Sequence, residues 1–168
     1  GAGYTVRELL DDFSRRLDNQ LQDQPEVEAT IRATIGNAYR RLALPEKAER
    51  HLKAALDLRR RIFGAEHEVV AESLLDYAFN FWEKDKNSTQ AVARAREGLA
   101  MCRKLGGQTE EMLVARRYLQ LFLGNSEEGE AEGNEALAIA KALKIKEDPD
   151  VAIILHSMAQ TKATNGDY

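Results

Sequence analysis

Apolar residues recur at intervals of three and four along most of this chain, which is the period of an α-helix. No run of β-branched residues alternates at period two, so strands are not expected. Helix starts are marked by proline or by a polar residue at eight positions: Thr5, Pro25, Pro45, His67, Ser88, Thr109, Ser126 and Asp148. The pattern therefore predicts an all-α fold.

The first predicted helix stands apart from those that follow. Thr5 and Glu8 have the spacing of a capping box. One apolar stripe follows, formed by Leu9, Leu10, Phe13, Leu17 and Leu21. Residues 1–24 are therefore interpreted as an N-terminal helix that covers the exposed face of the next unit.

The stretch from Ile31 to Ala55 places small and large apolar residues where two antiparallel helices must touch. It follows the pattern L-G-x2-Y…A-x3-F at five positions: Ile35, Gly36, Tyr39, Ala48 and Leu52. Arg32 stands where that pattern has tryptophan. On these residues the stretch resembles a tetratricopeptide (TPR) repeat.

The same signature returns further along the chain. Ala78 is the counterpart of Gly36, 42 residues later, and the pair Ala55-Leu56 returns as Gly98-Leu99. The interval exceeds the ~34 residues of the simple repeat, and the longer linkers resemble those of kinesin-light-chain-type repeats. The expected division is an array over 25–168, with repeats at about 25–66, 67–107 and 108–146 and a half-repeat at 147–168. The resemblance implies a right-handed superhelix of antiparallel helix pairs, an α–α solenoid.

A second resemblance covers mainly residues 5–55. This segment resembles the region that follows the kinase domain in bacterial, planctomycete-type serine/threonine kinases with C-terminal TPR arrays. The shared residues are Gln24, Pro25, Val27 and Ala29. The chain has no glycine-rich phosphate loop, HRD-type loop or DFG segment, so any kinase activity would belong to the parent protein.

The TPR resemblance implies a protein–protein interaction scaffold with a concave groove lined by the first helix of each pair. The groove residues it implies are Asn37, Arg40, Leu75, Asp76, Phe79, Met112, Arg116, Leu119 and His156. Phe79 and Trp82 either face this groove or pack against neighbouring helices. The expected partner is a protein or peptide. The alternative is a self-association module, a homodimer formed through exposed helix ends.

Composition narrows the function classes. There are 24 Lys and Arg against 28 Asp and Glu, a net charge of −4, which argues against a nucleic-acid partner. The single cysteine, Cys102, excludes an internal disulfide and a cysteine metal cluster, and its helical spacing predicts burial. No apolar run approaches the ~20 residues of a membrane span. We expect a cytoplasmic protein.

No catalytic constellation is visible. None of the three histidines has a carboxylate, Cys or His at ligand spacing, so neither an enzyme nor a metal or cofactor site is expected. His51 is predicted to be exposed and His67 to cap a helix. The cations at 59–61 are expected to face the negative end of a helix dipole, with a phosphate or acidic-partner site as the alternative. Gly129 and Gly133 are interpreted as packing glycines, with local fraying as the alternative.

Overall fold

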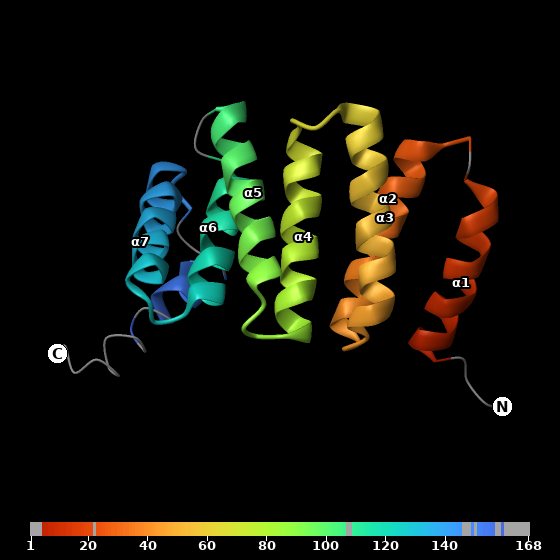
Figure 1. Ribbon diagram of the computed structural model, residues 1–168, viewed down its shortest axis with the longest axis horizontal. Coiled ribbons are helices and arrows are strands. Elements are labelled where there is room, and N and C mark those ends of the chain that lie inside the picture. The colour runs from red at the N-terminus through yellow and green to blue at the C-terminus, as the bar shows by residue number, and fades with distance from the viewer. Residues whose placement is uncertain are drawn as a thin grey trace.

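The computed structural model describes residues 5–21, 23–106, 109–145, 149, 151–156 and 159. Within these residues the regular structure is helical. The helices are α1 (Val6–Gln20), α2 (Pro25–Arg41), α3 (Pro45–Phe63), α4 (Glu68–Lys84), α5 (Thr89–Leu105), α6 (Glu110–Leu123) and α7 (Glu127–Ala142), and residues 151–156 are also helical. Consecutive helices pack as antiparallel pairs, α2 with α3, α4 with α5 and α6 with α7 (Figure 1). The fold is an all-α solenoid of antiparallel helix pairs.

The predicted helix starts are confirmed where they lie in the described residues. Thr5 and Glu8 form the capping box of α1. The ring of His67 accepts a hydrogen bond from the Val69 N–H, and the Ser126 hydroxyl accepts one from the Gly129 N–H. The predicted start at Asp148 lies outside the described residues. Side-chain caps therefore set most of the turns between helices.

Glycine leaves room for a close contact at two points of the array. A Cβ added to Gly36 in α2 would lie 2.7 Å from Cγ of Leu52 in α3, well inside ordinary contact. A Cβ on Gly129 would lie 2.4 Å from the carbonyl oxygen of Gly124, in the turn before α7. This contact confirms the packing role predicted for Gly129.

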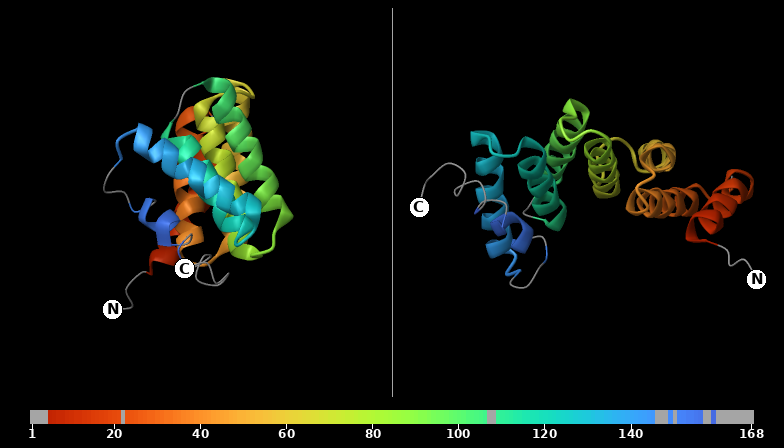
Figure 2. Two further views of the ribbon diagram at one scale, coloured as in Figure 1. Left: turned by 90° about the vertical axis from the view of Figure 1, so that its left-hand side faces the viewer. Right: turned by 90° about the horizontal axis from the view of Figure 1, so that it is seen from below.

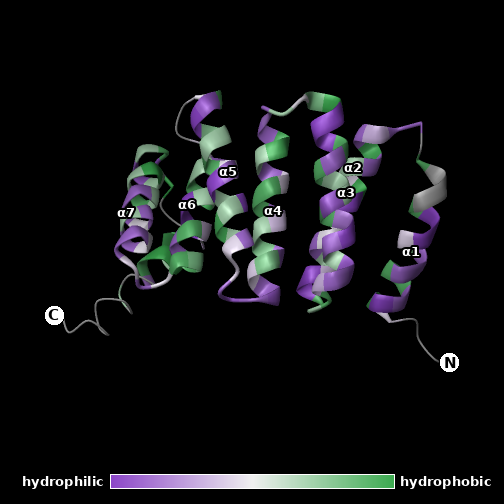
Figure 3. Cartoon of the chain, in the orientation of Figure 1, coloured by the Kyte–Doolittle hydropathy of each residue, from purple (hydrophilic) through white to green (hydrophobic). Residues whose placement is uncertain are grey.

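The apolar core runs through the array between the helix pairs. In Figure 3 apolar residues dominate α4, which lies at the centre and packs against α3, α5 and α6. Cys102 is buried in this core, as predicted. Arg59 is also buried, and its guanidinium donates to Ser73 and to the Val69 carbonyl and pairs with Glu72. The first cation of the 59–61 run therefore joins α3 to α4.

Helix α1 covers the first pair through polar contacts. The Asp11 carboxylate accepts hydrogen bonds from the Tyr39 hydroxyl at 2.7 Å and from the Lys47 ammonium at 2.5 Å. Ser14 Oγ lies 2.8 Å from Nε2 of His51 in a buried contact. The prediction that His51 is exposed was wrong: its exposed fraction is 2%. Sequence periodicity within α3 could not show that α1 lies over this position.

The array curves into an arc. The right-hand view of Figure 2 shows α2, α4 and α6 toward the inner side of the arc and α3, α5 and α7 toward the outer side. Close backbone approaches agree with this: α2 meets α4 and α4 meets α6, whereas among the described residues α3 does not meet α5, nor α5 α7. The first helix of each pair therefore lines the concave face.

Candidate functional site

Four of the predicted groove residues meet between α2 and α4. Asn37 donates from Nδ2 to Oδ2 of Asp76 at 2.9 Å. Arg40 donates from Nε to Oδ1 of Asn37 at 3.2 Å, and its guanidinium carbon lies 4.6 Å from the ring centre of Phe79. Arg40 also pairs with Glu83 at 3.4 Å. Arg40 is thus held by the hydrogen bond, the ion pair and the ring together.

The surroundings of Asp76 change the pKa of its carboxyl. Burial raises the pKa of its carboxyl, because desolvation disfavours the charged form. The hydrogen bond from Asn37 acts in the opposite direction and is the smaller effect. The hydrogen bond from the Asn37 amide to the Asp76 carboxylate joins α2 to α4.

The structure places four other predicted groove residues in the core. Leu75, Met112 and Leu119 are exposed by 3%, 7% and 1%. Leu75 packs against Gly98 of α5. Arg116 is also buried, and it pairs with Glu132 and Glu135 of α7 at 2.5 and 3.6 Å. Leu75 and Arg116 thus contact the second helix of their own pair, and Met112 and Leu119 lie in the apolar core.

His156 lies apart from the others. It is exposed on the helical segment 151–156. Gln120 of α6 donates from Nε2 to the Ile154 carbonyl at 3.4 Å, which places that segment against α6. His156, a groove residue implied by the resemblance, therefore lies on a segment that contacts α6, one of the helices on the concave face.

An aromatic patch joins α4 to α6. We define it as Phe79, Trp82, Tyr118 and Phe122. Ring centres lie 4.9 Å apart for Phe79 and Tyr118, 5.7 Å apart for Trp82 and Phe122, and 5.7 Å apart for Tyr118 and Phe122. These spacings fall within the range of favourable ring pairs. All four side chains are only partly buried, so the patch presents an apolar surface between the two inner helices.

Cations border the aromatic patch. Lys86 Nζ lies 3.4 Å from the Trp82 ring centre, and the guanidinium carbon of Arg117 lies 4.6 Å from that of Tyr118. With Arg40 over Phe79, three rings of the patch have a cation within the ~6 Å range of cation–π attraction. Sequence reasoning included Phe79 and weighed Trp82. It missed Tyr118, although an aromatic pair at i, i+4 in α6 was visible.

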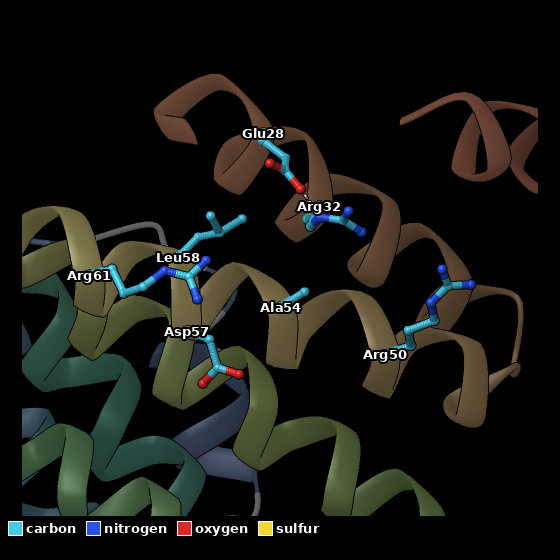
Figure 4. Close-up of a pocket in the computed structure, with 7 residues that line it drawn as sticks. All are labelled: Glu28, Arg32, Arg50, Ala54, Asp57, Leu58 and Arg61. Carbon is cyan, nitrogen blue, oxygen red and sulfur yellow. Dashed lines mark hydrogen bonds and ion pairs between the residues drawn. The ribbon is translucent and has the colours of Figure 1, made fainter. Parts of the chain in front are cut away.

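A hollow lies between α2 and α3 (Figure 4). It has a volume of about 350 Å³ and is lined by Glu28, Arg32, Arg50, Ala54, Asp57, Leu58 and Arg61. Arg32 occupies the tryptophan position of the TPR pattern. Its Nε donates to Glu28 at 2.7 Å along the same helix, and both side chains line the hollow. Mixed charges line this hollow, and two of its three arginines come from α3.

Residues 27–104 match the family model of the tetratricopeptide repeat. The match covers α3 and α4 in full and most of α2 and α5, and it supports a TPR repeat protein. No curated protein matches the chain. TPR repeats mediate protein–protein interaction, which fits an inner face that carries an exposed aromatic surface.

Two further properties concern the whole described chain. None of the helices in the described residues is both long and apolar enough to cross a membrane. The same residues contain no group of three or more His, Cys, Asp or Glu placed to hold a metal ion.

Proposed function

We propose that this chain is a non-catalytic scaffold that binds a protein segment along its concave face, with the aromatic patch as the principal contact. The observation that carries the proposal is the position of the patch. Aromatic side chains with exposed surface are common anchors of protein interfaces, especially when apolar rings are bordered by polar groups. Here Phe79 and Trp82 of α4 meet Tyr118 and Phe122 of α6, and α4 and α6 are the helices that line the inner side of the arc.

The contact chemistry also indicates how a segment would bind. Rings offer apolar area at a small cost in side-chain freedom. Asn37, Asp76 and Arg40 hold one another, so α2 and α4 present a fixed surface beside the rings. A pre-formed surface of this kind reduces the ordering cost of binding. We therefore expect a linear segment to contact the rings first and the α2–α4 polar row second.

A displayed library of random peptides, selected on the wild-type protein, tests the proposal. Trp82→Ala and Tyr118→Ala should each weaken binding of the selected peptides by about 2 kcal/mol, roughly 30-fold, as expected of hot-spot residues. Phe63→Ala is the matched control, because Phe63 is a partly buried aromatic at the end of the outer helix α3, stacked on His67. Peptides that bind all three variants as well as wild type would contradict groove binding.

We also propose that the array is the regulatory or docking region of a bacterial serine/threonine kinase, which implies a cytoplasmic location. The support is the resemblance of residues 5–55 to kinase-associated segments. The complete coding sequence of the parent gene tests this. A kinase domain in the same product supports the proposal, and a product without one contradicts it.

A further inference from the structure

Ion pairs link the outer helices of successive repeats. The guanidinium of Arg60 in α3 lies 2.6 Å from the carboxylate of Glu97 in α5. The guanidinium of Arg96 in α5 lies 2.6 Å from the carboxylate of Glu128 in α7. Among the described residues the backbones of α3 and α5 do not approach each other closely, nor do those of α5 and α7. Long charged side chains therefore span both gaps between outer helices.

Helix α5 holds both of its outer neighbours from one point. Arg96 and Glu97 are adjacent in sequence, so their side chains leave the helix about 100° apart. Arg96 reaches α7, and Glu97 reaches α3. Arg94 pairs with the same Glu97 carboxylate at 3.0 Å along α5, which helps to fix its position. A line of charge pairs thus runs from α3 through α5 to α7.

The inner row is joined by contacts that are less exposed to dissolved salt. The rings of the aromatic patch join α4 to α6, with the centres of Phe79 and Tyr118 4.9 Å apart. Arg40 pairs with Glu83 between α2 and α4, and the Arg40 side chain is 15% exposed. The side chains of the two outer pairs are exposed by 34–53%. Because salt screens exposed charges more than buried ones, it should weaken the outer links first.

The shape of the array gives the outer links a mechanical role. The outer helices α3, α5 and α7 lie on the convex side of the arc (Figure 2). When such an arc bends further, its outer helices spread while the inner row acts as the pivot. A link between outer helices opposes this spreading. An exposed ion pair shifts an equilibrium by less than about fivefold, so these links bias the curvature and do not lock it.

We propose that the Arg60–Glu97 and Arg96–Glu128 pairs are salt-sensitive tethers that set the curvature of the array. At low ionic strength they hold the outer helices together and keep the arc open. When salt screens them, the outer helices spread about the inner row and the concave face closes. This change needs no bound partner, so its test is independent of whether the aromatic patch binds a protein segment.

The distance between spin labels on α3 and α7 tests the proposal in the full chain. Arg61→Cys and Ala138→Cys supply exposed label sites on these helices, whereas Cys102 is buried. Raising the salt from about 0.01 M to about 1 M shortens the Debye length from ~30 Å to ~3 Å. Opening each gap from 2.6 Å to the ~4 Å limit of an ion pair should then lengthen the label distance by about 3 Å.

Charge variants separate the tethers from general effects of salt. Glu97→Gln combined with Glu128→Gln should give the longer distance already at low salt. Glu128→Arg alone should also lengthen it, and the added change Arg96→Glu should restore the shorter distance. Lys53→Gln is the matched control, because it removes an exposed ion pair to Asp57 within α3 and should leave the distance as in wild type. Circular dichroism checks that each variant keeps its helix content.

The outcomes are distinct. A wild-type distance that does not change with salt overturns the proposal. So does a double glutamine variant that keeps the shorter distance at low salt, or a charge exchange that is no better than Glu128→Arg alone. A control variant, Lys53→Gln, that lengthens the distance as much as the double glutamine variant also overturns it.

Discussion

The close approach of α2 and α3 at Gly36 gives a quantitative prediction. In Gly36→Ala the new Cβ would lie 2.7 Å from Cγ and 2.8 Å from Cδ2 of Leu52. Ordinary carbon–carbon contacts are ~3.5–4.0 Å, so the methyl group intrudes by roughly 1 Å. Leu52 is 2% exposed and is packed within the apolar core.

Two effects of opposite sign set the size of the change. Alanine is favoured over glycine inside a helix by ~1 kcal/mol. Overpacking of a filled core costs ~1–3 kcal/mol. The steric cost should win, and we expect Gly36→Ala to lower the free energy of unfolding by up to ~2 kcal/mol.

A double-mutant cycle with Leu52→Ala isolates the contact. Leu52→Ala alone should cost ~2–5 kcal/mol, but it removes the two side-chain atoms that the new Cβ meets. On that background Gly36→Ala should become neutral or stabilising by up to ~1 kcal/mol. The cycle should therefore show a coupling of about 2 kcal/mol.

Urea unfolding measures each corner of the cycle. Helix content and the emission of Trp82 should report the same transition midpoint. A coupling below ~0.5 kcal/mol would mean that the two sites act independently. Gly36 would then have no steric role between α2 and α3, and the reasoning would be refuted.

Three further substitutions probe other contacts. Asn80, fully buried, donates from Nδ2 to the Pro45 carbonyl at 3.2 Å; in urea unfolding Asn80→Ala should cost ~1–3 kcal/mol, whereas Asn87→Ala at an exposed turn should change stability by under ~0.5 kcal/mol. Burial raises the pKa of Asp76 in the folded chain. Above the ordinary aspartate pKa of ~3.9, where the unfolded chain ionises this carboxyl freely, the buried charge therefore lowers the free energy of unfolding. Asp76→Asn should therefore raise the melting temperature at neutral pH and have little effect at lower pH; a lower melting temperature at pH 7 would contradict this. Arg116→Ala should lower thermal stability, since it leaves two carboxylates of α7 without their cation; an unchanged melting temperature would show that the pairs contribute nothing.

The sequence was sufficient for the fold because the decisive signals are local. Caps such as Thr5 and Ser126 show in the sequence where helices begin. Gly36 and Leu52 are close in sequence as well as in space, so one motif records their contact. A repeated local signature predicts an array without knowledge of distant contacts.

The inner surface was predicted less well because it depends on contacts between repeats. Asn37 and Arg40 follow the TPR register, and in the structure they contact Asp76 and Phe79. In α6 the register places Met112 and Leu119 in the groove, yet both pack in the core. The rings that contact α4 are those of Tyr118 and Phe122, which lie on a different face of α6 from Met112 and Leu119.

The burial of polar residues was also not predictable from the sequence. His51 is covered by α1, which is distant in sequence, and only the packing of α1 reveals the Ser14 contact. The apolar stripe of α1 shows the same limit from the opposite side. Leu9, Phe13 and Leu17 lie on one stripe of the helix, but only Leu17 is buried and the other two are exposed.

The emission of Trp82 tests the central claim most directly, since it is the only tryptophan of the chain and lies within the aromatic patch. A peptide selected on the wild-type protein should change this emission in a saturable way and protect Trp82 from a soluble quencher. The same peptide should do neither in Tyr118→Ala at equal concentration. If calorimetry shows that the peptide binds while the emission and quenching of Trp82 stay unchanged, the partner binds elsewhere and the account is contradicted.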